Sequence, residues 1–253
     1  MEPNELKQVI ASLKSLSPSQ QRVVSSLIAK LRRPITSTLL VERAPFTAEF
    51  VACFGDVLVA HHAMSAQPFT KDKFEWAMVT ALKDCGLEAE HGPRGLPGYD
   101  IVVGPEKWSL KTQADRSIKL DRIHISKFME LGKGHWSDEA SLAGLRDRFL
   151  THMRGYNRIF TLRHLLRQEA GVEEHYYELV EIPKALLSEA KSGTITMQSK
   201  SKQNPQPGYC RVTDAAGDLR FALYFDGGTE RKLQVKNLRK DLCQVVAAWR
   251  FGV

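Results

Sequence analysis

One carboxylate and one ammonium stand at the two ends of a short predicted hairpin. Asp100 comes directly before the apolar run Ile101–Val103, and Gly104-Pro105 then interrupt the chain. The pattern resumes from Trp108 to Lys111, so the stretch predicts two short strands joined by a tight turn. A hairpin of this kind holds its two ends side by side.

Alternation along the second strand decides which side chains share a face. Ser109 and Lys111 are two residues apart and point to one face, whereas Trp108 and Leu110 point to the other. A carboxylate such as Asp100 can hold a divalent metal, and an ammonium can polarise a water or offset charge on a phosphate. This chemistry would cleave a phosphodiester. The same residue types also occur in exposed hairpins with ordinary charges, and spacing alone leaves both interpretations open.

Length and composition limit the class of protein. A chain of 253 residues with 43% hydrophobic and 26% charged residues can bury one generous core, or one core and a small lobe. No apolar run approaches the roughly 20 residues that span a membrane, and no secretory signal is expected at the start. The four cysteines form no CxxC pair, which argues against a thiolate zinc site and favours reduced thiols in a cytoplasm.

The charge balance favours a polyanionic partner. Lys and Arg number 36 against 29 Asp and Glu, a net charge of +7. The excess is concentrated between Thr194 and Lys240, where nine basic residues face four acidic ones. Nucleic acid is therefore the leading partner class.

Two amphipathic helices are predicted within residues 1–33, the second opening with Ser17 as N-cap and Pro18 as its first residue. We expect them to form a lobe for packing or dimerisation. The apolar run from Phe50 to His62 predicts a strand, on which the adjacent His61 and His62 face opposite ways. This arrangement does not favour a two-histidine metal site.

The remaining pattern alternates helices and strands. A helix from Thr70 to about Leu82, stopped near Gly86, carries Glu75 in its second turn. After the hairpin we expect these elements: a strand near 123–125, a turn at 127–131, a helix opening at Ser137-Asp138-Glu139, strands at 158–163 and 175–182, a short helix after Pro183, and a β-rich remainder with a basic loop at 200–208. This order predicts an α/β (α+β) fold with a mixed central sheet flanked by helices and a β-rich appendage.

The order of these elements resembles the core of the PD-(D/E)xK nucleases. From about Phe54 onward the chain is similar, more specifically, to the SmaI family of type II restriction endonucleases. The resemblance rests on separate blocks in the same order, among them Thr70-Lys71, Phe74-Glu75, Pro97-Gly98-Tyr99-Asp100-Ile101, Leu110-Lys111-Thr112, Met129-Glu130-Leu131-Gly132-Lys133-Gly134, Arg158–Arg163, Leu179–Lys184, Leu223–Gly228 and Glu230–Gln234.

This resemblance implies a homodimeric, Mg²⁺-dependent enzyme of the bacterial cytoplasm that cuts double-stranded DNA at a palindrome. A shared specificity would make the site CCCGGG with a blunt cut, and a companion DNA methyltransferase would protect the host. It also implies a division of the chain: a helical segment at 1–45 and a restriction-endonuclease-like domain at 46–253, with a nuclease core at about 66–165 and a DNA-binding β-rich part at about 194–253.

The chain departs from the family motif at one position. Ser109 stands two residues before Lys111, where the motif has its second acidic residue, and a serine supplies no negative charge to Mg²⁺. Glu75 and Glu130 are the two candidates to replace it, and Glu75 is favoured because it lies on the helix before the core. With Asp100 and the Leu110 backbone carbonyl, one of them would bind the metal. Glu106 is expected to point away.

Basic residues of the β-rich part are expected to contact DNA. The expected phosphate contacts are Lys200, Lys202, Arg231, Lys232 and Lys236. Gln203, Asn204 and Gln206 could read bases, although a solvated polar loop explains them equally well. Two other functions stay open: a DNA-binding protein without catalysis, for which the absent acid at Ser109 speaks, and a structure-specific repair nuclease.

Overall fold

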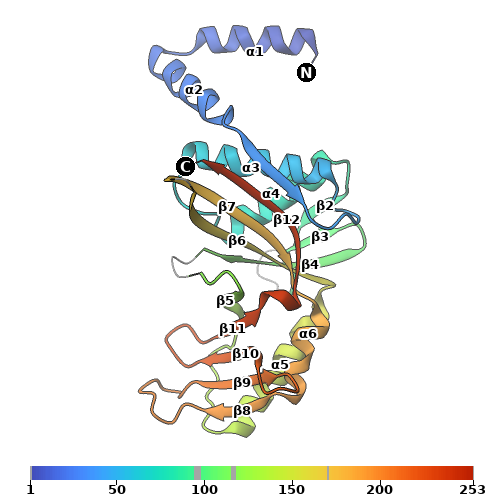
Figure 1. Ribbon diagram of the computed structural model, residues 1–253, viewed down its shortest axis with the longest axis vertical. Helices are drawn as coiled ribbons and strands as arrows, with labels where there is room; N and C mark the ends of the chain where they lie inside the picture. Colours follow the sequence, from blue (N-terminus) through green and yellow to red (C-terminus); the bar gives the residue numbers. More distant parts are fainter. Residues whose placement is uncertain (1, 94–97, 115–117, 170, 253) are drawn as a thin grey trace.

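The computed structural model describes residues 2–93, 98–114, 118–169 and 171–252, and two sheets follow one another along its long axis (Figure 1). Pro97, the first residue of one of the sequence blocks above, lies outside the described residues. In spatial order the first sheet contains β1 (Ile35–Leu39), β12 (Gln244–Gly252), β7 (Val172–Glu181), β6 (Arg158–Glu169), β4 (Glu106–Gln113), β3 (Ile101–Val103) and β2 (Ala89–His91).

Only one neighbouring pair in the described first sheet is parallel, β4 with β6, so the sheet is mixed as predicted. The second sheet is antiparallel, and its strands in spatial order are β5 (Arg122–Glu130), β11 (Lys232–Arg239), β10 (Leu219–Asp226), β9 (Gly208–Thr213) and β8 (Thr194–Met197). The predicted α/β (α+β) class is confirmed.

Helices cover the first sheet because alternate strand residues are apolar on both faces. α3 (Ala48–Met64) and α4 (Lys71–Asp84) pack on one face, against Trp108, Leu110 and Phe160. α5 (Glu139–His152) and α6 (Lys184–Ser188) share a second apolar cluster with the second sheet, and Ile159 from the first sheet belongs to that cluster. Three short 3₁₀ turns complete the described elements: η1 (Met153–Gly155), η2 (Glu189–Ser192) and η3 (Lys240–Leu242).

The two predicted N-terminal helices are confirmed as α1 (Pro3–Ser15) and α2 (Pro18–Leu31). The Ser17 hydroxyl accepts the backbone N–H of Gln20, as expected of an N-cap. Neither helix has a buried residue, and both extend away from the first sheet (Figure 1). Their role in packing or dimerisation stays a prediction.

Two expected elements are wrong. The segment from Phe50 to His62 lies within helix α3, because apolar residues on several sides of a helix mimic a buried strand. Residues 127–130 continue strand β5 instead of turning, so Glu130 lies on a strand. The expected limits of the helical segment and of the nuclease domain stay a prediction. β1 from the helical segment pairs with β12 from the β-rich part, inside the sheet that holds the hairpin.

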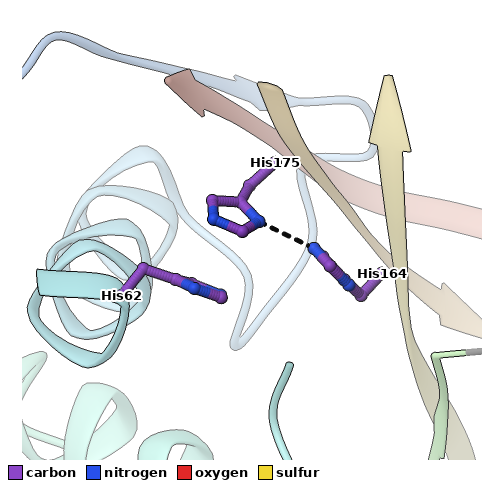
Figure 2. A group of neighbouring side chains, drawn as sticks. All are labelled: His62, His164 and His175. Atoms are coloured by element: carbon purple, nitrogen blue, oxygen red, sulfur yellow. Dashed lines mark hydrogen bonds between the residues drawn. The ribbon is translucent and has the colours of Figure 1, made fainter. Parts of the chain in front are cut away.

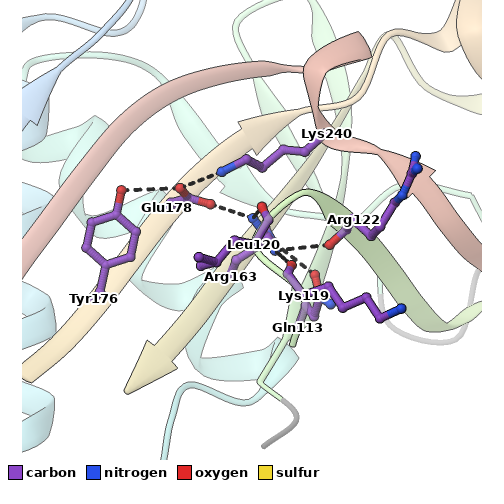
Figure 3. Close-up of polar contacts among 8 residues, drawn as sticks. All are labelled: Gln113, Lys119, Leu120, Arg122, Arg163, Tyr176, Glu178 and Lys240. Atoms are coloured by element: carbon purple, nitrogen blue, oxygen red, sulfur yellow. Dashed lines mark hydrogen bonds and ion pairs between the residues drawn. The ribbon is translucent and has the colours of Figure 1, made fainter. Parts of the chain in front are cut away.

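A buried charge network ties the first sheet to the chain that leads into the second (Figure 3). Arg163 on β6 is fully buried and bonds the Glu178 carboxylate on β7 at 2.5 Å and the Gln113 amide on β4 at 3.0 Å. Its other N–H groups reach backbone carbonyls of the connection, at Lys119, Leu120 and Arg122. The Lys240 ammonium on η3 also donates to the Glu178 carboxylate, at 2.9 Å. The Arg163 guanidinium thereby holds the start of β5 against the first sheet.

Candidate active site

The hairpin has the predicted form. β3 and β4 pair antiparallel with Ile101 opposite Trp108, and the Asp100 backbone N–H donates to the Trp108 carbonyl at 2.8 Å. Trp108 and Leu110 are fully buried in the apolar cluster under α3 and α4. Ser109 and Lys111 therefore share the opposite face, as expected.

Asp100 and Lys111 meet through Ser109. The Asp100 carboxylate accepts the Leu110 backbone N–H at 2.6 Å and the Ser109 hydroxyl at 3.2 Å. The Lys111 ammonium donates to the Ser109 oxygen at 2.9 Å and lies 3.7 Å from the carboxylate. Leu110 thus reaches Asp100 with its N–H, whereas its carbonyl was the atom expected to serve the site.

The pKa values of Lys111 and Asp100 are both lowered, but by different causes. Burial lowers the pKa of Lys111 to about 8, although the nearby Asp100 opposes the shift. Burial would by itself raise the pKa of Asp100, but the positive charges of Lys111 and Lys71 and the Leu110 N–H outweigh it, and the pKa lies below its usual value. At neutral pH the pair is a carboxylate beside an ammonium that can readily lose its proton.

Lys71 is a site residue that the sequence interpretation missed. It is the first residue of α4, and its ammonium lies 2.6 Å from Asp100 Oδ1 and 3.3 Å from Glu75 Oε1. Burial raises the pKa of Glu75, and Lys71 opposes that shift. One cation therefore bridges the two carboxylates. The i, i+4 spacing of Lys71 and Glu75 was a signal for their pairing, but not for Asp100 as the shared partner.

Glu130, the other candidate acid, is far more exposed than Glu75. Its side chain is 70% exposed and pairs with Lys127 at 2.9 Å. It lines a cleft of about 1220 Å³ between β4, β5 and α5, together with Lys71, Lys111 and His152. The structure thus joins Glu75 to Asp100 through Lys71 and leaves Glu130 on the wall of the cleft. Glu106 bonds the Trp108 indole at 2.8 Å instead of contacting these groups.

Two buried hydroxyls near these residues have no hydrogen-bond partner within the described parts of the chain. One belongs to Tyr156, whose pKa is raised by burial and by the charge of Asp100. The other belongs to Thr161, which pairs in register with Lys111 across β4 and β6. His152, at the cleft wall, has its pKa lowered by burial and by Lys111. Unsatisfied polar groups are rare in interiors and often mark functional sites.

Comparison with known proteins identifies the family. The model of the SmaI family, type II site-specific deoxyribonucleases, matches residues 9–251. The chain belongs to this family. It is also 45% identical over 207 residues to the type II restriction enzyme SmaI of Serratia marcescens, which covers 81% of each chain. No solved structure matches it.

As a restriction enzyme, the protein described here has DNA as its partner. A second cavity of about 700 Å³ adjoins the cleft and shares Glu130 and Gly132 with it. Gln203, Asn204 and Arg231 line this cavity. Arg231 donates to the carbonyls of Lys133 and Gly134. The fold therefore brings three residues that the sequence suggested as DNA contacts to one cavity, next to the cleft that Lys111 lines.

The other expected DNA contacts are dispersed. Lys200 and Lys202 are exposed on the loop before β9. Lys232 pairs with Glu230 at 3.3 Å, and Lys236 lies over the Tyr224 ring, 3.7 Å from its centre. Burial lowers the pKa of Lys236. Among the described helices of the enzyme, none is long and apolar enough to cross a membrane.

Proposed function

We propose that this type II restriction endonuclease hydrolyses double-stranded DNA with Mg²⁺ held by Asp100 and Glu75, next to Lys111. The observation that carries the proposal is the single ammonium of Lys71 between the two carboxylates. Two partly buried carboxylates that converge on the same ammonium form a place where positive charge is stabilised.

The residues fit the metal. Mg²⁺ prefers oxygen ligands and is commonly bound by one or two carboxylates. Asp100 and Glu75 offer such oxygens, the Leu110 carbonyl is the expected backbone ligand, and Glu130 is the alternative acid from across the cleft. A bound Mg²⁺ would lower the pKa of a coordinated water and offset charge on the scissile phosphate. Lys71 would then move away and face the phosphate backbone.

Lys111 would orient the attacking water and offset charge that develops on the phosphate. Ser109 accepts a hydrogen bond from the Lys111 ammonium and donates one to Asp100, so it would position both groups without supplying charge itself. Burial keeps the ammonium poorly hydrated, which strengthens its interaction with an anionic transition state.

The target is proposed to be the palindrome CCCGGG with a blunt cut, read by a twofold homodimer. Gln203, Asn204 and Arg231 would approach base edges, and Lys200, Lys202, Lys232 and Lys236 would contact phosphates. In a bacterial cytoplasm a companion methyltransferase would protect the host DNA.

Digestion of a plasmid with one CCCGGG site tests the proposal. Linear product that forms only with Mg²⁺, with flush ends at the centre of the site, is expected. A matched plasmid with the site scrambled should stay intact. Nicking of both plasmids would indicate a repair nuclease, and tight DNA binding with no cleavage would indicate a binding protein, whose only support here is Ser109.

A further inference from the structure

Three histidines outside the candidate active site meet on the side of the first sheet that α3 covers. His62 reaches from α3 toward His164 on β6 and His175 on β7 (Figure 2). One nitrogen of each ring lies within 4.8 Å of the other two, and His164 Nε2 is 2.9 Å from His175 Nδ1. His164 and His175 are buried, and His62 is half-buried.

We propose that His62, His164 and His175 bind a divalent transition-metal ion of the Zn²⁺ class. In a tetrahedral site with Zn–N bonds of 2.0–2.1 Å, ligand nitrogens are about 3.3 Å apart. The His164–His175 nitrogen distance of 2.9 Å is shorter than this, and the rings of His62 and His175 are stacked with centroids 3.8 Å apart. A metal would turn the rings so that their nitrogens converge, and it would replace the His164–His175 hydrogen bond and the Tyr177 bond to His62 Nε2.

Hydrogen bonds already set His62 for coordination. A carbonyl can only accept, so the contact of His62 Nδ1 with the Ser65 carbonyl, at 3.1 Å, places the ring proton on Nδ1. Nε2 then carries the lone pair, and the Tyr177 hydroxyl donates to it at 2.7 Å. A metal-binding histidine has the same arrangement, with its second nitrogen donating to a backbone carbonyl.

The triad is also neutral and accessible. Burial lowers the pKa of His62 to about 3 and those of His164 and His175 to about 4, so the rings are in the unprotonated form that binds metals. A cavity of about 270 Å³, lined by His62, His175 and Phe251, offers an entry path and room for a water as fourth ligand.

Ligand type separates this site from the one at Asp100. Imidazole suits Zn²⁺, Co²⁺, Ni²⁺ and Cu²⁺, whereas Mg²⁺ is bound by carboxylate, carbonyl and water oxygens. The ion would link α3 to the β6–β7 pair, so its expected effect is on stability and not on the chemical step.

Calorimetric titration of the metal-stripped full chain with Zn²⁺, in excess Mg²⁺, tests the proposal. One Zn²⁺ per chain is expected, and Zn²⁺ at a hundredfold excess over its Kd should raise Tm by about 5–10 °C. His62→Ala and His175→Ala should each abolish the stoichiometric binding. His91→Ala, at an exposed histidine on β2, should bind as the wild type does.

Absence of one-to-one binding in the wild-type chain would overturn the proposal, as would unchanged binding in both cluster variants. A measurement that needs no variant covers the case in which they misfold. X-ray absorption of the Zn²⁺-loaded wild type should show imidazole nitrogens at 2.0–2.1 Å. A shell dominated by sulfur would assign the ion to the cysteines and refute the triad.

Discussion

The first sheet buries two cations against carboxylates on the same face, Lys111 on β4 and Arg163 on β6, where Arg163 lies in register with Gln113, two residues after Lys111. Arg163, beside Gln113, pairs with Glu178, and Lys111 pairs with Asp100. Around Arg163 the hydrogen bonding is saturated by two side chains and three backbone carbonyls. The Lys111 site instead opens on a large cleft and adjoins two hydroxyls that have no hydrogen-bond partner among the described residues. A closed network holds a structure together, whereas an open one has capacity left for a ligand.

The chemistry of the two cations supports the same distinction. Arginine stays charged in proteins, so removal of its partner leaves a buried charge with no compensation. Lys111, with its pKa lowered to about 8 by burial, can lose its proton instead. Removal of the Glu178 carboxylate should therefore lower the stability of the fold, whereas removal of the Asp100 carboxylate should leave the fold intact.

The largest effect is expected from Asp100→Ala. Loss of the metal-binding carboxylate should reduce the cleavage rate roughly ten-thousandfold. The fold should survive because Lys111 can become neutral. Single-turnover digestion measures the rate, and DNA affinity without divalent metal should change by less than about threefold, since the proposed phosphate contacts at Lys200, Lys202, Lys232 and Lys236 lie elsewhere. Glu90→Ala, at an exposed acid on β2, is the matched control. Wild-type cleavage by Asp100→Ala would refute the metal site.

Glu178→Ala should have the next largest effect, on stability instead of activity. It leaves the Arg163 guanidinium buried and unpaired, which should cost about 3–5 kcal/mol of unfolding free energy. Urea unfolding followed by circular dichroism measures this cost. Asp147→Ala removes the carboxylate of an exposed pair with Arg146 and should cost less than about 1 kcal/mol. Equal losses in the two variants would contradict the structural role of the closed network.

The two candidate metal ligands, Glu75 and Glu130, should differ in their smaller effects on the cleavage rate. Glu75→Gln should slow cleavage roughly a hundredfold, because the uncharged amide weakens metal binding next to Asp100. Glu130→Gln, on the exposed cleft wall, should stay within about threefold. Cleavage rates across a Mg²⁺ titration distinguish the two, with Asp72→Asn on the same helix as control. A larger loss for Glu130→Gln would reverse the assignment.

Ser109→Ala should have a smaller effect than Glu75→Gln, about tenfold on the cleavage rate. It removes the hydroxyl that joins Lys111 to Asp100, and with it two hydrogen bonds to charged groups, but no charge. Metal affinity should not change, because the serine supplies no charge. A shift in the Mg²⁺ concentration at half-maximal rate would instead indicate that Ser109 contacts the metal.

What sequence could predict here was local. The hairpin at Asp100, the caps at Ser17 and Asp138 and the positive-φ glycine at Gly86 are set by neighbours in the chain. Strand alternation correctly gave the shared face of Ser109 and Lys111. Lys71 was missed because only tertiary packing brings the start of α4 to Asp100.

Other failures came from contacts between distant segments. A run such as Val57-Leu58-Val59 has the same apolar character in a buried strand and in a helix packed on several sides, so α3 was assigned wrongly. The histidine cluster joins residues more than one hundred positions apart, at His62 and His164. Spacing carries no signal for such a cluster. Nothing in the sequence indicated either that β12 pairs with β1 on one side and β7 on the other, because its register depends on both of these distant strands.

The pairing of β1 with β12 also has a consequence for the order of assembly. Ile35 lies opposite Phe251, and the Trp249 indole donates to the Val51 carbonyl at 2.7 Å. A ribosome that has made only the early elements has made no partner for β1, and β7 keeps an unpaired edge. Contacts of such long sequence separation form slowly. The sheet that carries Asp100 and Lys111 is therefore completed only after residues 244–252 have been translated, which delays the appearance of an intact nuclease in the cell that makes it.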